Sequence, residues 1–197
     1  EQGKPFLDKV MYGVENGEFY TYFNQTGITF RFAEYKAIER DEEEEAREER
    51  EENHEESEEE EREKQKFERV WHTVNLKFVN ANPLTEVVAA EKVKEYYNYA
   101  GYTDNAQYNF VPAYKKIKFV NIYPGVDAEF ELPAEGGIKY QFMVKPGVTI
   151  PAIAFELTGN DGLAIDEKGN LLINSVFGNL TDHAPTAYTA LSHTPIL

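Results

Sequence analysis

The strongest constraint on the fold is a period of two in the apolar residues of the second half of the chain. Ile138, Tyr140, Phe142 and Val144 occupy every second position, and the segment AIAFEL, which ends at Leu157, repeats the pattern. Successive side chains of a β-strand point to opposite faces of a sheet, so this spacing produces one apolar face and one polar face. The pattern therefore predicts half-buried strands of an antiparallel sheet.

Turn residues separate these segments at short intervals, in PAEGG, KPG, GNDG and DEKGN. Alternating segments also occur earlier, at residues 19–32 and 73–79. Many short strands divided by such turns are typical of sandwiches and barrels. We expect a single β-rich domain over residues 1–197, built as an antiparallel β-sandwich or a partly closed barrel.

Residues 82–101 do not follow one pattern. Asn82 and Pro83 can begin a short helix, whereas the segment from Tyr96 to Gly101 favours a strand or a loop. The sequence leaves both structures open for this segment.

A run of acidic residues interrupts the strand pattern. Residues 41–64 hold 16 acidic and 4 basic side chains, a net charge of −12, which leaves about −4 for the rest of a chain whose total is −16. The run has no apolar alternation, no Gly and no Pro, and its Glu–Arg and Glu–Lys pairs at a spacing of four favour a helix. We expect an acidic helix or helical hairpin inserted at residues 36–70.

This charge distribution excludes some partners and suggests others. An acidic surface gains nothing by counterion release from nucleic acid or an anionic membrane, so neither is expected. The run itself has three interpretations: a solvated polyanion, a weak Ca²⁺ ligand, or a docking surface for another protein module. The candidate docking residues are Glu42, Glu43, Glu58, Glu59, Glu60 and Glu61.

The sequence lacks catalytic constellations. It has no cysteine, its four histidines lack the spacing of a zinc site, and no serine lies in a nucleophile elbow. Asp127 could pair with Glu129 or Glu131, but Pro124-Gly125 favours a turn that Asp127 caps. DEKGN is similarly a hairpin turn rather than a calcium loop. We therefore expect a protein that is not an enzyme and has no cofactor beyond weakly bound Ca²⁺.

Four tyrosines crowd one short segment of the chain. Tyr96, Tyr97, Tyr99 and Tyr102 supply flat faces on which sugar rings can stack, although such residues also pack in cores and at sheet edges. They are the candidate ligand-binding residues, with carbohydrate as the ligand.

Several short motifs together resemble the sequence pattern of one known family. They are the Asn-Tyr stretch that ends at Gly101, Tyr-Pro-Gly-Val-Asp at residues 123–127, the segment KYQFMVKPG at residues 139–147, and Gly-Asn-Leu at residues 169–171. With them the chain resembles the N-terminal β domain of large surface proteins of Bacteroidota, which carry seven-bladed β-propeller (SBBP) repeats or gliding-motility-associated modules. The family pattern has Ile where this chain has Val126 and Asp where it has Gln141, so a carboxylate is missing from that strand.

The resemblance implies export from a precursor by the type IX secretion system and display at the cell surface, with no catalytic residues. We expect a non-catalytic structural or interaction module, the N-terminal part of a larger exported assembly whose other modules or subunits are its partners. A carbohydrate- or ligand-binding module of a surface adhesin is the alternative, and a metal-dependent hydrolase is the third. No apolar run approaches the ~20 residues of a membrane helix.

Overall fold

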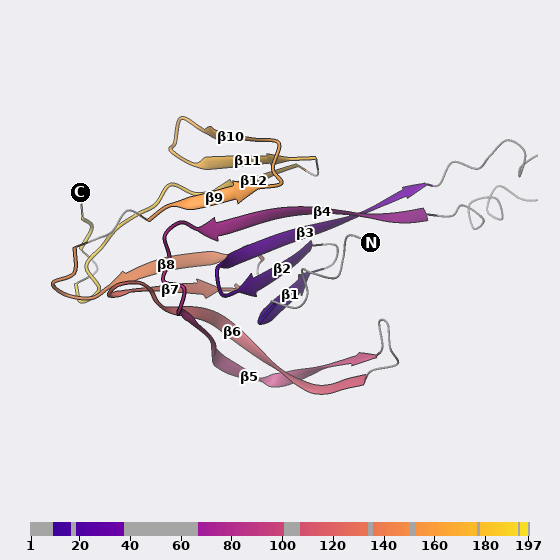
Figure 1. Cartoon of the computed structure of the whole chain (residues 1–197), viewed down its shortest axis with the longest axis horizontal. Helices are drawn as coiled ribbons and strands as arrows, with labels where there is room; N and C mark the ends of the chain where they lie inside the picture. The colour runs from indigo at the N-terminus through magenta and orange to yellow at the C-terminus, as the bar shows by residue number, and fades with distance from the viewer. Residues whose placement is uncertain are drawn as a thin grey trace, which may run out of the picture.

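The computed structural model describes residues 10–16, 19–37, 67–100, 107–133, 136–149, 153–176, 178–192 and 194–196, and its strands form three antiparallel sheets (Figure 1). Sheet I contains, in order, β1 (Tyr12–Asn16), β2 (Phe19–Asn24), β3 (Gly27–Ala37), β4 (Phe67–Phe78) and β9 (Phe155–Thr158). Sheet II contains β5 (Glu86–Ala100), β6 (Gln107–Tyr123), β7 (Val126–Glu131) and β8 (Lys139–Val144). Sheet III contains β10 (Gly162–Ile165), β11 (Leu171–Ser175) and β12 (Gly178–Asp182).

The expectation of a mainly β, antiparallel fold is confirmed. Every pairing between these strands is antiparallel, and the described strands form open sheets rather than a closed barrel. The described residues contain no helix.

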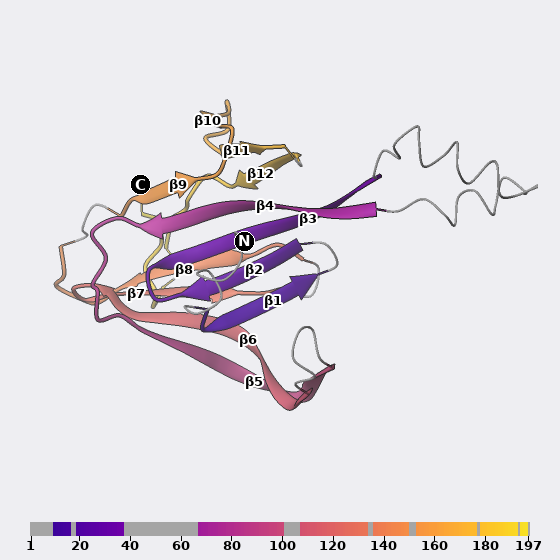
Figure 2. The same cartoon turned by 45° about the vertical axis from the view of Figure 1, so that its right-hand side comes forward.

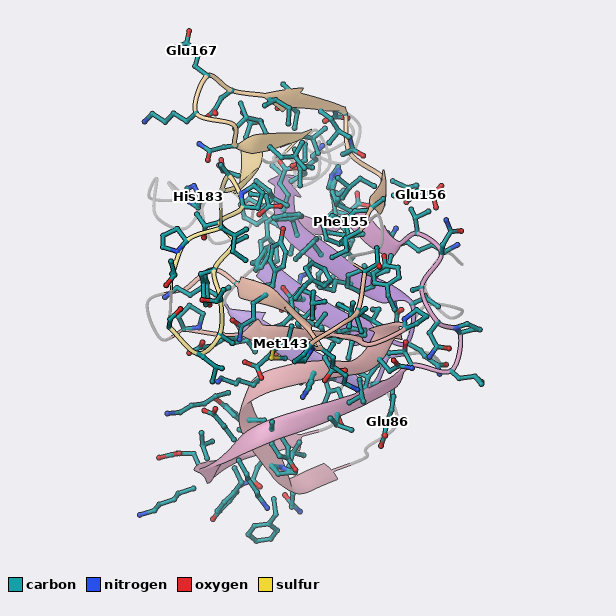
Figure 3. All side chains as sticks on the ribbon, turned by 90° about the vertical axis from the view of Figure 1, so that its left-hand side faces the viewer. Glu86, Met143, Phe155, Glu156, Glu167 and His183 are labelled. Carbon is teal, nitrogen blue, oxygen red and sulfur yellow. The ribbon has the colours of Figure 1, made fainter. Side chains whose placement is uncertain are left out.

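Sheets I and II face each other across one hydrophobic core. Phe23 and Phe78 of sheet I meet Phe119 and Phe130 of sheet II, with ring centroids between 5.3 and 6.5 Å apart. All four rings are buried. The next residues along each strand point away from this core, as Glu156 does beside Phe155 in Figure 3. The period of two in the sequence is therefore the signature of two sheets that share one apolar layer.

The helix expected at residues 36–70 is not seen at either end of that range. Lys36 and Ala37 belong to β3, and residues 67–70 belong to β4, where Ala37 pairs with Phe67. The expectation was wrong there because the two strands stay paired beyond the core, and cross-strand side-chain contacts stabilise such a pair. Residues 38–66, which hold the acidic run, lie outside the described residues.

Most of the segment that the sequence left open forms one long strand, β5. Asn82 lies in a turn, in which its side-chain oxygen accepts the N–H of Leu84 at 3.0 Å and its carbonyl accepts the hydroxyl of Thr85 at 2.8 Å. No helix follows, since β5 begins at Glu86. β5 then runs from Glu86 to Ala100 and pairs with β6, with two shifts of register along the way. Val87 is buried against Phe119, so pairing with β6 and burial against the core decide the structure of a segment whose local pattern favours neither state.

Two hairpins reach beyond the core. β2 pairs with β3 only as far as Phe32, whereas β3 and β4 stay paired out to Ala37. β7 pairs with β6 from Lys116 onward, whereas β5 and β6 stay paired out to Ala100. Figures 1 and 2 show the far ends of both hairpins on the same side of the molecule. We call them the β3–β4 arm and the β5–β6 arm.

Sheet III is a small unit beside sheet I. Its strands pair only with one another, and Ile173 on its middle strand is buried. DEKGN forms the β10–β11 turn, as expected, with the Asp166 carboxylate accepting the N–H groups of Lys168 and Asn170. Glu167 at this turn points into solvent (Figure 3). A hydrogen bond of 2.7 Å from the Tyr140 hydroxyl to Asp182 joins sheet III to sheet II.

Candidate binding site on the β5–β6 arm

An exposed pair of aromatic rings lies on the β5–β6 arm. Phe110 is 70% exposed and Tyr96 is 53% exposed, yet the ring centroids are only 4.9 Å apart, with 47° between the ring planes. Aromatic rings bury a large apolar area when a partner covers them, and rings of the hydrophobic core are normally covered within the domain. This pair is therefore a candidate contact surface.

The backbone at Phe110 is in an unfavourable conformation. Its φ is +60°, a value that a bulky side chain rarely adopts. The other described non-glycine residues with positive φ are two asparagines, which tolerate it, and Glu91, which lies on the same arm. A hydrogen bond of 2.9 Å from the Phe110 N–H to the Asn98 side-chain oxygen holds this conformation. The two strained residues thus both belong to the arm that carries the exposed rings.

The pairing of β5 with β6 is irregular within the arm, and this changes the direction of its side chains. The β5–β6 register shifts between Lys92 and Tyr96 and again between Tyr97 and Tyr99. Bulges of this kind bend a strand and turn its side chains to a new direction, and they are common next to functional sites. The second shift falls at Asn98 and Phe110, directly beside the contact between the Phe110 and Tyr96 rings.

The structure separates the four predicted tyrosines. Tyr96 and Tyr97 are both about half exposed, but they are neighbours within β5 and pair with Pro112 and Val111 respectively, so they face opposite sides of the arm. Tyr99 pairs with Tyr108, and its side chain and the whole of Tyr102 lie outside the described residues.

Phe110 joins the site without having been predicted from the sequence. Its positive φ and the register that brings it to Tyr96 depend on the pairing of β5 with β6. No local pattern in the sequence indicates either feature.

A second group of aromatic and charged side chains lies on the outer face of sheet I, where β2 pairs with β3 and the β3–β4 arm begins. The guanidinium carbons of Arg31 and Arg69 each lie 4.1 Å from the ring centroid of Trp71, and we call these residues the Arg–Trp stack. Tyr20 meets Trp71 edge-on at 5.2 Å, and its hydroxyl accepts a hydrogen bond of 2.7 Å from Arg69. The stack lies on the hairpin that carries the acidic run. The six candidate docking glutamates of that run, residues 42, 43 and 58–61, lie outside the described residues.

The outer face of sheet II carries paired charges. Lys116 lies 2.8 Å from Glu91 and 3.4 Å from Glu129, and a hydrogen bond with Glu91 raises the pKa of Lys116. The Lys116 ammonium on β6 thus offsets the charge of carboxylates on both neighbouring strands, β5 and β7. Within the ranges that the structure describes, no three or more His, Asp or Glu side chains are arranged to hold a metal ion.

A shallow hollow of about 230 Å³ lies beside the β2–β3 turn. Its charged lining consists of Lys77 and Glu156, and it contains no histidine or serine. Threonine and asparagine side chains supply the rest of its polar lining. No helix in the described part of the chain is long and apolar enough to cross a membrane.

Comparison with known proteins identifies the family of this chain. Neither the curated proteins nor the solved structures contain a match to this chain. One family model, described as "Domain of unknown function (DUF7948)", matches residues 1–196. The match spans both arms and all three sheets, so the chain belongs to the family described as Domain of unknown function (DUF7948).

Proposed function

We propose that this chain is a non-catalytic interaction module of a surface protein, and that the Tyr96–Phe110 pair on the β5–β6 arm makes the contact with its partner. The observation that carries the proposal is an exposed phenylalanine in a strained backbone conformation, packed against an exposed tyrosine. The resemblance to N-terminal domains of exported Bacteroidota proteins supports a place outside the cell, with other modules of a surface assembly as partners.

In the domain without a partner, both the backbone conformation and the exposed ring of Phe110 are unfavourable in free energy. A non-glycine residue in the left-handed region costs on the order of 1–2 kcal/mol. Leaving a phenylalanine ring in water forgoes a further ~1.5–3 kcal/mol relative to burying it. Backbone strain of this kind persists where the surrounding structure imposes it, and it is concentrated at ligand contacts and switch regions. A partner that covers both rings would recover the apolar term.

Site-specific photo-crosslinking tests this proposal in cells that produce the protein. A photoreactive phenylalanine analogue replaces Phe110 in one variant and Leu84, which is 84% exposed, in the control. We expect a discrete crosslinked adduct from position 110 and none of the same mass from position 84. Adducts that are identical at the two positions, or absent at both, would contradict the proposal.

Carbohydrate is the second candidate for the ligand. The observation that favours it is the same open pair of rings, because pyranose C–H groups pack on exposed aromatic faces. A glycan array probed with wild type, Phe110→Ala and Leu84→Ala would decide. If carbohydrate is the ligand, Phe110→Ala should lose about fivefold in binding, since one aromatic contact is worth on the order of 1 kcal/mol. Leu84→Ala should bind like wild type.

A further inference from the structure

We infer that the open edge of β10 in sheet III binds an extended segment of a partner protein, which adds one more strand to that sheet. The segment has apolar side chains at alternate positions and basic residues at its ends. The inference does not depend on the proposed function, because β10 lies in a different sheet from the Tyr96–Phe110 pair.

The backbone of β10 presents hydrogen-bonding groups that no described strand pairs. β10 pairs with β11 alone and is therefore an edge of sheet III. The Asp166 N–H donates to the Asn170 carbonyl at 3.0 Å, next to the turn, which makes these two residues a hydrogen-bonded pair. Hydrogen-bonded and non-hydrogen-bonded pairs alternate along an antiparallel ladder, so Ala164 bonds to β11. The N–H and C=O groups of Leu163 and Ile165 point to the open edge, where an added strand can pair with them.

The side chains of β10 carry the apolar face of sheet III out to this edge. Leu163 lies opposite Ile173 and Ile165 lies opposite Leu171, so these four side chains share one face. Ile173 is buried, whereas Leu163 is 52% exposed and Ile165 is 68% exposed. A strand with apolar residues at every second position would cover these two side chains while its backbone pairs with β10.

β10 also lacks a feature that protects the other edges. Natural edge strands commonly carry charged side chains, which prevent pairing with another chain. The other edges among the described strands are β1, β5, β8, β9 and β12, and each contains at least one charged residue. β10 (Gly162–Ile165) contains none. Its composition therefore favours the addition of a strand.

The charges beside β10 favour a basic partner over a second copy of this chain. Residues 161–168 hold three acidic side chains and one basic side chain, a net charge of −2. Asp161 and Glu167 lie at the two ends of β10, and both are exposed. Two β10 strands paired antiparallel, with their apolar residues opposite each other, would also place Asp161 opposite Glu167 of the second copy. Like charges directly opposite each other are destabilising, whereas lysine or arginine at the ends of the bound segment would be attracted.

Amide hydrogen exchange of the full chain, followed residue by residue by NMR, tests the inference. The probe is a short peptide that alternates valine and threonine between terminal lysines. Without it, the amides of Leu163 and Ile165 should exchange much faster than the amide of Ala164, which is bonded to β11. Peptide at about ten times its Kd should slow the exchange of Leu163 and Ile165 about tenfold, because exchange then requires the free protein. No change in these two amides at millimolar peptide would overturn the inference.

Two matched substitutions test the apolar contact. Ile165→Thr keeps a β-branched side chain but removes apolar surface, and it should raise the Kd of the peptide about tenfold. Ala164→Thr adds the same side chain on the opposite face of β10 and should leave the Kd unchanged. Continued protection of the amide at position 164 shows that sheet III is intact in each variant. Equal Kd values for the two variants would overturn the inference.

A second peptide and the protein concentration identify the occupant. A peptide with terminal glutamates in place of the lysines should bind more weakly, and equal binding would overturn the assignment of a basic partner. Protection of Leu163 and Ile165 that increases with protein concentration in the absence of peptide would overturn the assignment to another protein and identify a second copy as the occupant.

Discussion

Asp127 shows how one carboxylate fixes a turn of the core sheet. It accepts the Asn121 N–H at 2.7 Å and lies 3.1 Å from the Lys118 ammonium, while Gly125, with φ of +75°, completes the β6–β7 turn. The sequence predicted that Asp127 caps this turn, and the hydrogen bond confirms it. Burial acts to raise the pKa of Asp127, but the Asn121 hydrogen bond and Lys118 outweigh burial and lower it.

Replacing Asp127 with asparagine should therefore have a pH-dependent effect on stability. Because the pKa is lower in the folded state, the charged form stabilises the fold above the unfolded pKa of about 3.9. This contribution is lost as the pH falls through the folded pKa. We expect Asp127→Asn to lower the free energy of unfolding by about 1–2 kcal/mol at pH 7 and by less below pH 4. Urea unfolding at several pH values measures this difference.

Glu167→Gln is the control for that experiment, because Glu167 points into solvent. Its difference from wild type should stay near zero across the same pH range. A destabilisation by Asp127→Asn that does not change with pH would show that the charge of Asp127 does not contribute.

At the scale of the element, the β5–β6 arm stores backbone strain at Phe110. Alanine and glycine at position 110 both remove the ring, but only glycine removes the steric cost of φ +60°. We expect Phe110→Gly to be more stable than Phe110→Ala by about 1 kcal/mol. Thermal and urea unfolding of the two variants measure this difference.

The same pair of substitutions at Tyr97 supplies a control of opposite sign. Tyr97 has no positive φ, so glycine there only increases the entropy of the unfolded chain. Tyr97→Gly should be less stable than Tyr97→Ala. If glycine is also the less stable substitution at position 110, the strain does not exist in solution.

The β3–β4 arm should form without the acidic run. Its ladder reaches Ala37 and Phe67, and the Arg–Trp stack stabilises the pair from the outer face. Replacing residues 41–64 with a short Gly-Ser linker should change the free energy of unfolding by about 1 kcal/mol or less, a shift of a few degrees in Tm. A calorimetric scan measures it. Loss of cooperative unfolding would show that the run is needed for the fold.

At the scale of the whole molecule, the paired core and sheet III should unfold as separate units. Phe119 is fully buried between sheets I and II, where it contacts Phe23, Phe78 and Phe130. Phe119→Ala should cost about 3–5 kcal/mol and accelerate amide exchange throughout both sheets. Ile173→Ala should accelerate exchange in β10, β11 and β12 while β6 stays protected. Faster exchange of β6 in Ile173→Ala would contradict this division.

The sequence by itself determined the mainly β, antiparallel class, the alternating strands of the second half of the chain and some of their turns. A period of two needs only the geometry of one strand, as Tyr140 and Phe142 illustrate, and a turn such as DEKGN needs only contacts among neighbours in sequence. The same local reasoning placed Asp127 at its turn, 123–127.

Only the tertiary structure decided the extent of β3–β4, the state of residues 86–100 and the pairing of Phe110 with Tyr96. The expected helix was extended to residues 36–37 and 67–70 without a helix-favouring pair there, and the pairing of β3 with β4 makes these residues strand. The site on the β5–β6 arm depends on the pairing of two strands, which no single segment encodes. Local patterns determine local conformation, whereas the meeting of distant residues depends on the packing free energy of the whole fold.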